Sequence, residues 1–198
     1  MNTEPLSVAS IQPDLKTACW GQNLVCLSQI PSTNDYARQL AQTGAPEGTV
    51  VVAEHQTAGR GRYDRRWIAP AGSSLLFSLL FRPRLNPDQA QHLTMICALA
   101  LADEIECQSD LTVRLKWPND ILINGKKAGG ILTELEIQNG AIDYAIVGVG
   151  LNVNLDPSEL PADLAVAATS LAHESGRPMS RVALLRGFLE ALEARYRL

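Results

Sequence analysis

The sequence has few aromatic residues, few cysteines and histidines, and no long apolar run. Aromatic residues make up 5% of its 198 positions, and no apolar run reaches the ~18 residues that a membrane-spanning helix needs. The first ten residues carry neither a basic segment nor an apolar core, so we expect no signal peptide. The 4 cysteines and 3 histidines show no C-x-x-C pair and no metal-ligand spacing. We therefore expect reduced thiols and a cytoplasmic protein.

Signatures of nucleophilic, zinc and dinucleotide chemistry are also missing. The sequence contains no G-x-S-x-G, no H-E-x-x-H, no Walker lysine loop and no G-x-G-x-x-G. Its net charge of −4 argues against a general nucleic-acid binder, which usually has a broad basic face. A hydrophobic fraction of 46% with 19% charged residues is typical of a globular protein, and we expect one domain over residues 1–198.

Hydrophobic periodicity predicts helices before, within and after a run of strands. We expect a weakly ordered arm over residues 1–20, then helices from Ser32 to about Gly44, over 87–107, and from Ser180 to Leu198 after a shorter one. The expected strands cover 22–30, 49–54, 74–83, 112–117, 120–125, 127–137 and 141–154. Asn-Gly pairs at 124–125 and 139–140 are strong hairpin signals. Together these elements predict an α+β fold with a mixed, mainly antiparallel sheet flanked by helices.

The segment AGRGRYDRRW, residues 58–67, concentrates positive charge in an acidic chain. Residues 59–67 hold four arginines and one aspartate. Guanidinium groups on a backbone loosened by glycine can surround a phosphate. A solvated basic loop is an equally good interpretation of the segment alone, because charged runs usually face water.

Two predicted strands carry polar residues on one face. Alternation over 113–117 places Arg114 and Lys116 opposite three apolar residues, and solvent exposure explains this pattern somewhat better than ligand binding. Over 147–154, one face carries Gly148, Gly150, Asn152 and Asn154. That face could receive a planar ligand close to the backbone, or it could pack closely against a helix. The pattern favours neither alternative.

Five motifs occur in a fixed order along the chain. They are S-T-N at 32–34, Q-T-A-G-R-G-R at 56–62 with Trp67, K-W-P-N-D at 116–120, K-x-A-G-G-I-L-x-E at 126–134 and V-G-V-G-L-N-V at 147–153. Together they closely resemble biotin–protein ligase over residues 25–155. The resemblance implies a fold similar to class II aminoacyl-tRNA synthetases. It also implies activation of biotin with Mg-ATP to biotinyl-5′-AMP, followed by transfer to one lysine of a biotin carboxyl carrier protein of acetyl-CoA carboxylase.

The resemblance also implies site residues. Biotin contacts would fall on Ser32, Thr33, Asn34, Gln56, Gly59, Arg60, Lys116, Gly148 and Gly150. ATP and adenylate contacts would fall on Arg62, Arg65, Trp67 and Asn152. The catalytic charges would be Lys116, Arg62 and Arg60, which can neutralise a carboxylate attacking a phosphate. The resemblance identifies no metal ligands. It implies no nucleic-acid or membrane partner, and either a monomer or a homodimer.

Three departures from the family pattern stand out. Asp64 takes the place of the glycine that usually stands in the second half of the arginine loop. No helix-turn-helix region precedes the motifs, so a repressor function is not expected. The small β-barrel domain that usually follows is not expected either. The alternatives are a lipoate–protein ligase of related fold and a biotin- or nucleotide-binding module without turnover.

Overall fold

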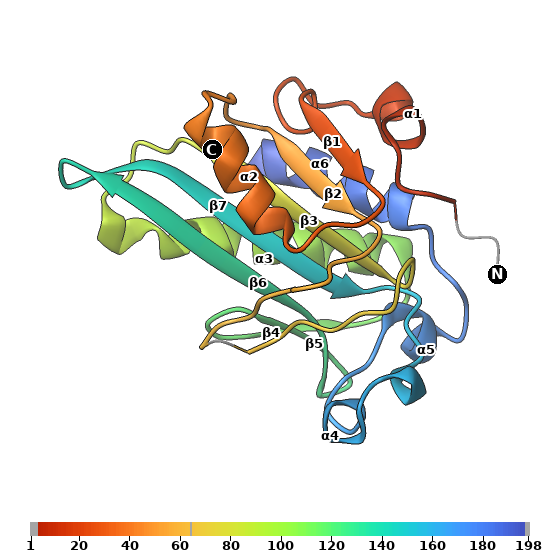
Figure 1. The fold of residues 1–198 in the computed structure, drawn as a ribbon. Helices are drawn as coiled ribbons and strands as arrows, with labels where there is room; N and C mark the ends of the chain where they lie inside the picture. The colour runs from red at the N-terminus through yellow and green to blue at the C-terminus, as the bar shows by residue number, and fades with distance from the viewer. Residues whose placement is uncertain (1–3, 64, 197–198) are drawn as a thin grey trace.

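A single mixed sheet organises the chain. The computed structural model describes residues 4–63 and 65–196. Within them, seven strands lie in the order β1-β2-β3-β7-β6-β5-β4, as Figure 1 shows. The strands are β1 (Leu24–Leu27), β2 (Val50–Ala53), β3 (Ser74–Phe81), β4 (Val113–Lys116), β5 (Asp120–Ile123), β6 (Lys126–Gln138) and β7 (Ala141–Asn152). β1 pairs with β2 in parallel and the other pairs are antiparallel, which confirms the predicted α+β class.

Both predicted Asn-Gly hairpins are present. Asn124 and Gly125 connect β5 to β6 with φ of 50° and 78°, and Asn139 and Gly140 connect β6 to β7 with φ of 52° and 79°. Positive φ at both central residues is the geometry of a type I′ turn, whose twist matches that of the flanking strands. The turn therefore fixes the pairing next to it, and a bulge between Glu136 and Ile137 then shifts the register of the long β6–β7 pair.

Helices cover the two faces of the sheet unequally. The α-helices are α1 (Val8–Ile11), α2 (Thr33–Gln42), α3 (Gln91–Gln108), α4 (Ala162–Ala165), α5 (Leu171–Ser175) and α6 (Arg181–Tyr196), and short 3-10 helices cover Gln12–Asp14, Pro87–Gln89 and Pro157–Glu159. α3 and α6 pack side by side behind the sheet, while α2 crosses the front (Figure 1). No helix among these residues is both long enough and apolar enough to cross a membrane.

Alternation along the central strands separates a large core from the front face. Phe77 of β3 and Val149 of β7 belong to the main core with α3 and α6. Leu80 and Ile146 instead pack beneath α2 in a smaller core. Because side chains alternate along a strand, Ser78 and Gly148 face the front of the sheet. They lie beyond the first turn of α2, and this open part of the front face holds the candidate site.

Two sequence predictions about local structure are wrong. The described part of residues 1–20 is not a weakly ordered arm, because α1 packs on α6 and the side chains of Ile11 and Trp20 are buried. Trp20 contacts Phe81 with ring centroids 4.4 Å apart, a contact across 61 positions that no local pattern reveals. The segment before α6 holds two short helices, α4 and α5, where one was predicted.

Candidate functional site

A cavity of about 710 Å³ opens on the front of the sheet at the N-terminal end of α2. Its walls come from the start of α2, the arginine segment, the β4–β5 turn, β6, β7 and residues 160–168. Among the described residues, one carboxylate lines it, that of Asp120, against six cationic side chains, which are Arg60, Arg62, Arg65, Arg66, Lys116 and Lys127. The cavity is therefore strongly positive in a protein whose net charge is −4, and it suits an anionic ligand.

Buried polar side chains form the floor next to α2. Ser32 is the N-cap of the helix, and its hydroxyl accepts a hydrogen bond from the backbone N–H of Asp35 at 3.5 Å. Gln56 Oε1 accepts bonds from the Thr33 backbone N–H at 2.7 Å and from the Thr33 hydroxyl at 3.0 Å. The Ser78 hydroxyl lies 2.6 Å from Asn34 Oδ1 and 2.7 Å from Thr33 Oγ1. These groups are held rigidly because nearly all of them are partnered and buried.

Two glycines on β7 allow side chains to lie directly on the sheet. A Cβ atom at Gly148 would lie 2.1 Å from Asn34 Oδ1, and one at Gly150 would lie 2.6 Å from Trp67 Cε2. The Asn34 amide and the Trp67 indole thus cover the backbone at Gly148 and Gly150. The sequence pattern had predicted either a ligand or a helix at this position. Both glycines still line the cavity. The Trp67 indole N–H is buried and has no hydrogen-bond partner among the described residues.

The arginine segment folds back on itself as a small irregular hairpin. The Gly61 N–H donates to the Arg65 carbonyl at 2.7 Å, and the Trp67 N–H donates to the Gly59 carbonyl at 2.9 Å. A Cβ atom at Gly59 would lie 2.6 Å from the Trp67 carbonyl oxygen, so the close approach requires glycine there. The predicted effect of Asp64 concerns a position outside the described residues.

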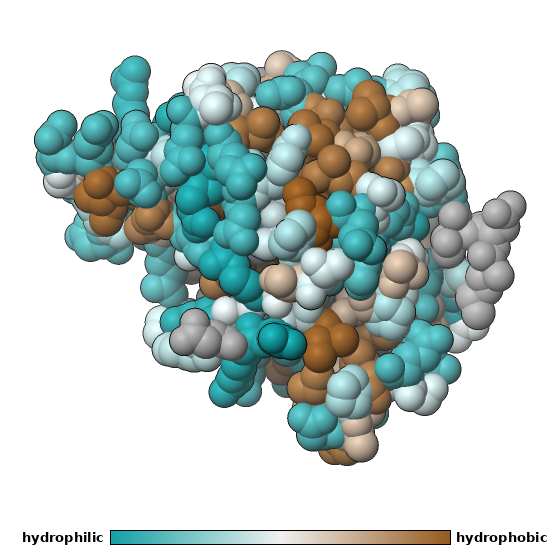
Figure 2. All heavy atoms as spheres, in the orientation of Figure 1, coloured by the Kyte–Doolittle hydropathy of each residue, from teal (hydrophilic) through white to brown (hydrophobic). Residues whose placement is uncertain are grey.

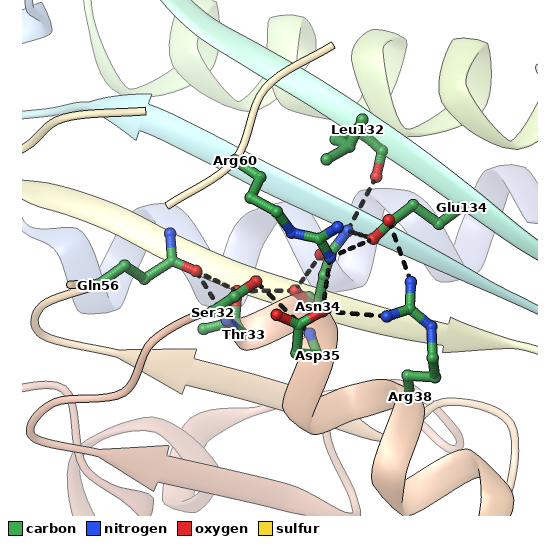
Figure 3. Close-up of polar contacts among 10 residues, drawn as sticks. Ser32, Thr33, Asn34, Asp35, Arg38, Gln56, Arg60, Leu132 and Glu134 are labelled. Carbon is green, nitrogen blue, oxygen red and sulfur yellow. Dashed lines mark hydrogen bonds and ion pairs between the residues drawn. The ribbon is translucent and has the colours of Figure 1, made fainter. Parts of the chain in front are cut away.

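The two arginines of the G-R-G-R motif have different surroundings. Arg60 Nη2 contacts Asp35 Oδ1 at 2.6 Å and Glu134 Oε2 at 3.0 Å, as Figure 3 shows. Arg62 instead contacts Asn119 Oδ1 at 3.4 Å and the Tyr63 hydroxyl at 3.3 Å. Within the described part of the chain, Arg62 therefore pairs with no carboxylate. Its charge is available to a ligand, whereas that of Arg60 is neutralised.

Lysines complete the positive wall. Lys116, at the end of β4, is exposed and forms no ion pair with another described residue. Lys127 contacts Asp120 Oδ1 at 2.6 Å and lies 5.8 Å from the centroid of the Trp67 ring. The described residues contain no group of three His, Cys, Asp or Glu side chains that could hold a metal ion.

Exposed apolar residues surround the mouth of the cavity. Tyr63, Trp117 and Val166 are 81%, 76% and 79% exposed. In Figure 2, hydrophilic residues dominate the projecting β6–β7 hairpin, while hydrophobic residues occur at the lower end, where Figure 1 places α4. The alternation predicted for residues 113–117 exists, but its apolar side is only partly buried: Val113 packs against the main core, whereas Leu115 and Trp117 are exposed.

The structure brings most of the predicted site residues together. The cavity is lined by Ser32, Thr33, Asn34, Gln56, Arg60, Lys116, Gly148, Gly150, Arg62, Arg65, Trp67 and Asn152. Gly59 lines an adjoining cavity of about 510 Å³ that shares the arginine segment. Asn154 lies elsewhere, because its side chain exchanges two hydrogen bonds with the Met179 backbone.

Sequence reasoning missed several residues of the site. Ser78 gave no signal, because a serine inside an apolar strand looks like a tolerated core residue. Asn119, Lys127 and Glu134 all stand inside the quoted motifs. Asn119 and Glu134 occupy specified positions of those motifs, which was the available signal, whereas Lys127 occupies an unspecified one. No role could be assigned to any of them without the contacts between strands.

Comparison with known proteins places the chain in a family. The model of the biotin/lipoate A/B protein ligase family matches residues 26–152, which include α2, the arginine segment and β7. The chain belongs to this family. The match spans the central motifs and nearly all of the cavity.

Relatives in the family are named as biotin ligases. The Mycobacterium tuberculosis biotin–[acetyl-CoA-carboxylase] ligase is 36% identical over 197 residues, covering 96% of this chain and 71% of the relative. The Bacillus subtilis bifunctional ligase/repressor BirA is 41% identical over 192 residues, covering 97% of this chain. This chain spans 59% of the length of that relative.

Solved structures of family members share the fold. The biotin protein ligase of Aquifex aeolicus in complex with biotin and ATP matches with a TM-score of 0.74 and 32% identity, covering 89% of this chain and 71% of that one. The biotin protein ligase of Leishmania major in complex with biotinyl-5-AMP matches with a TM-score of 0.70 and 30% identity, covering 87% and 74%.

Proposed function

We propose that this chain activates biotin with ATP to form biotinyl-5′-AMP and transfers the biotinyl group to a lysine of a biotin carboxyl carrier protein. The carrying observation is the positive cavity at the N-terminal end of α2 in a member of the biotin/lipoate ligase family. Relatives of this chain are named as biotin ligases, and solved neighbours are complexes with biotin, ATP or biotinyl-5-AMP. These names favour biotin over lipoate as the substrate.

The first step joins two anions, which is the difficulty that the site must overcome. An oxygen of the biotin carboxylate attacks the α-phosphorus of ATP, and the bond to the pyrophosphate oxygen breaks as pyrophosphate leaves. Arg62 and Lys116 carry charges that no described carboxylate neutralises, so they are the groups that we assign to the developing negative charge. Orientation of the two substrates supplies the rest of the acceleration, and no protein nucleophile is required.

The polar floor suits the uncharged end of biotin. Thr33, Gln56 and Ser32 present amide and hydroxyl groups fixed by their own hydrogen bonds, which can pair with the ureido group. In the second step, a neutral lysine amine of the carrier attacks the acyl carbon. The bond from that carbon to the phosphate oxygen breaks, AMP leaves, and the nitrogen loses a proton to solvent to give the amide. The residues assigned to adenylate in this proposal are Arg62, Arg65, Trp67 and Asn152.

Mg²⁺ would enter this site together with ATP. Magnesium in nucleotide sites is usually bound by one or two carboxylates together with substrate phosphates. Asp120 and the neighbouring Asn119 amide offer such oxygens in the cavity, and the ion would displace Lys127 from Asp120 and Arg62 from Asn119. Asp120 and Asn119 would hold the ion, which would supply further neutralisation of phosphate charge. The cytoplasmic location, the single-domain organisation of 1–198 and the monomer-or-homodimer state stay predictions.

Biotin-dependent exchange between ATP and pyrophosphate tests the first half-reaction. We expect exchange with biotin but not with lipoate, and transfer of labelled biotin to a carrier domain in a second assay. Binding of biotin without exchange would instead support a binding module, and exchange with lipoate alone would identify the other branch of the family.

Arg62→Gly separates binding from retention of the adenylate. We expect the variant to bind biotin with an unchanged Kd but to release biotinyl-AMP at least about tenfold faster, because one charge-assisted contact to phosphate is lost. Arg84→Gly is the matched control, since Arg84 is exposed and does not line the cavity. Unchanged retention in Arg62→Gly would contradict the role of Arg62.

Lys116→Ala tests the second free charge. We expect the exchange rate to fall by at least about a hundredfold, as for loss of one preorganised charge at a transition state. Lys16→Ala, on the exposed surface away from the cavity, should keep the wild-type rate. Normal exchange in Lys116→Ala would show that Lys116 only faces solvent.

A further inference from the structure

Four charged side chains form a closed ring beside the cavity. Arg60 contacts Asp35 at 2.6 Å and Glu134 at 3.0 Å, and Arg38 contacts the same two carboxylates at 3.0 Å each. Charges alternate around the ring, and its members come from the first turns of α2, from β6 and from the arginine segment (Figure 3). The ring therefore ties the start of segment 59–67 to two rigid elements.

Glu134 makes a contact that the other carboxylate of the ring does not make. Its Oε2 accepts a hydrogen bond from Asn34 Nδ2 at 2.7 Å, in addition to its bond from Arg60. Asn34 is the buried side chain that lies on Gly148 in the floor of the cavity. Glu134 thus connects the floor of the cavity with the segment that crosses its mouth. Its side chain is 22% exposed, less than those of the other three members.

We propose that Glu134 is a positioning residue that fixes segment 59–67 over the cavity by holding Arg60. Asp35 and Glu134 neutralise the Arg60 guanidinium group. This group therefore anchors the backbone at the start of segment 59–67. Arg62, two residues further along, then faces a ligand with its charge free. The effect on nucleotide handling rests on the proposed function, whereas the effect on the position of the segment does not.

A single surface ion pair of this exposure would contribute little, because water and salt screen it. The ring differs from such a pair in three respects. It has four interactions that share atoms, it includes a bond to a buried amide, and it joins segments 74 positions apart in the chain. Networks of this kind are where ion pairs have measurable effects.

Trypsin measures the position of the segment without any ligand. The exposed Arg65 and Arg66 are cleavage sites, and proteolysis reports how often the segment opens. For the full chain without ligand, we expect Glu134→Gln to speed cleavage within 59–67 at least about fivefold. Glu136→Gln is the matched control: Glu136 lies on the same strand face, is exposed and contacts no member of the ring.

Asp35→Asn separates the ring from the Asn34 contact. This change removes the second carboxylate of the ring without touching the bond between Glu134 and Asn34, so it should also speed cleavage. If Glu134→Gln speeds cleavage but Asp35→Asn does not, the ring is not the anchor and the proposal fails. Equal cleavage rates for wild type, Glu134→Gln and Glu136→Gln would overturn it as well. Each variant is first shown to melt within a few degrees of wild type, so that global unfolding does not imitate the effect.

Release of biotinyl-AMP gives the second readout. We expect Glu134→Gln to release the adenylate at least about fivefold faster than wild type in 0.05 M KCl. In 0.5 M KCl the release rates of wild type and Glu134→Gln should become similar. Salt screens the ion pairs of the ring in the wild type, whereas the variant has already lost part of the ring. A difference that persists at high salt would contradict the proposal. If neither protein forms an adenylate but the trypsin difference holds, the proposed function fails and the anchor stands.

Discussion

Replacing Gly148 by alanine should displace the buried Asn34 side chain from its hydrogen-bonded position. The added Cβ would lie 2.1 Å from Asn34 Oδ1 and 2.9 Å from its Cγ, whereas an ordinary contact needs at least 3.4 Å. The amide must therefore move by about 1 Å or more. Asn34 lies 2.6 Å from the Ser78 hydroxyl and 2.7 Å from Glu134 Oε2, and such a movement breaks both hydrogen bonds.

The cost follows from these contacts. Overpacking a rigid site costs about 1–3 kcal/mol, and each lost hydrogen bond adds about 1 kcal/mol, somewhat more where the acceptor is a carboxylate. We expect Gly148→Ala to lower the free energy of unfolding by about 2–4 kcal/mol and to weaken biotin binding at least about tenfold. Urea unfolding followed by circular dichroism gives the first quantity, and calorimetric titration gives the second.

A double mutant makes the reasoning refutable. Asn34→Ala removes the atoms that the new Cβ would meet, so Gly148→Ala should cost about 1 kcal/mol or less in that background. The two changes should therefore be strongly non-additive. If Gly148→Ala costs less than about 0.5 kcal/mol, or if the costs simply add, then Asn34 does not occupy the space above Gly148 and the account of the cavity floor is wrong.

Three further outcomes are expected. Gly150→Ala should displace the Trp67 indole, which a Cβ would approach to 2.6 Å. We expect the free energy of unfolding to fall by about 1–3 kcal/mol and the tryptophan fluorescence to change. Glu54→Gln should lower the free energy of unfolding, measured in urea, by about 3 kcal/mol. The Arg181 side chain is 2% exposed and would lose the carboxylate that lies 2.5 Å from its guanidinium group. Burial, with a smaller effect of Glu54, raises the pKa of the Cys26 thiol to about 11. Alkylation of Cys26 should therefore stay slow at pH 8. The contribution of this thiol to stability is complete below its unfolded pKa near 9 and is lost as pH rises toward 11.

Local chemistry accounts for the parts of the fold that sequence predicted well. Asn-Gly pairs need positive φ, so both hairpins could be placed from two residues each. Ser32 could be placed as a helix N-cap, because its hydroxyl replaces a backbone acceptor. The α+β class followed from the order of such elements, and the family followed from five motifs whose order is unlikely to arise by chance.

Contacts between distant segments account for what sequence could not supply. From the sequence, the glycines of β7 could lie beneath a ligand or beneath a helix. Nothing in residues 147–154 indicates that the side chains of Asn34 and Trp67 cover them. Arg60 and Arg62 look equivalent in the motif, yet only Arg60 meets two carboxylates. Trp20 seemed part of an arm because its partner, Phe81, lies far along the chain.

The base of the arginine segment depends on both ends of the chain. The Gly72 N–H donates to the Glu54 carbonyl at 3.1 Å, which closes the loop. The Glu54 carboxylate also accepts bonds from the Leu6 N–H at 2.7 Å and from Arg181 at the start of α6. During synthesis, Arg181 is made more than a hundred residues after Glu54. The Glu54 carboxylate therefore gains its full set of partners only when α6 docks, and a ribosome-bound chain that ends before α6 would carry every motif but lack this support at the base of the loop.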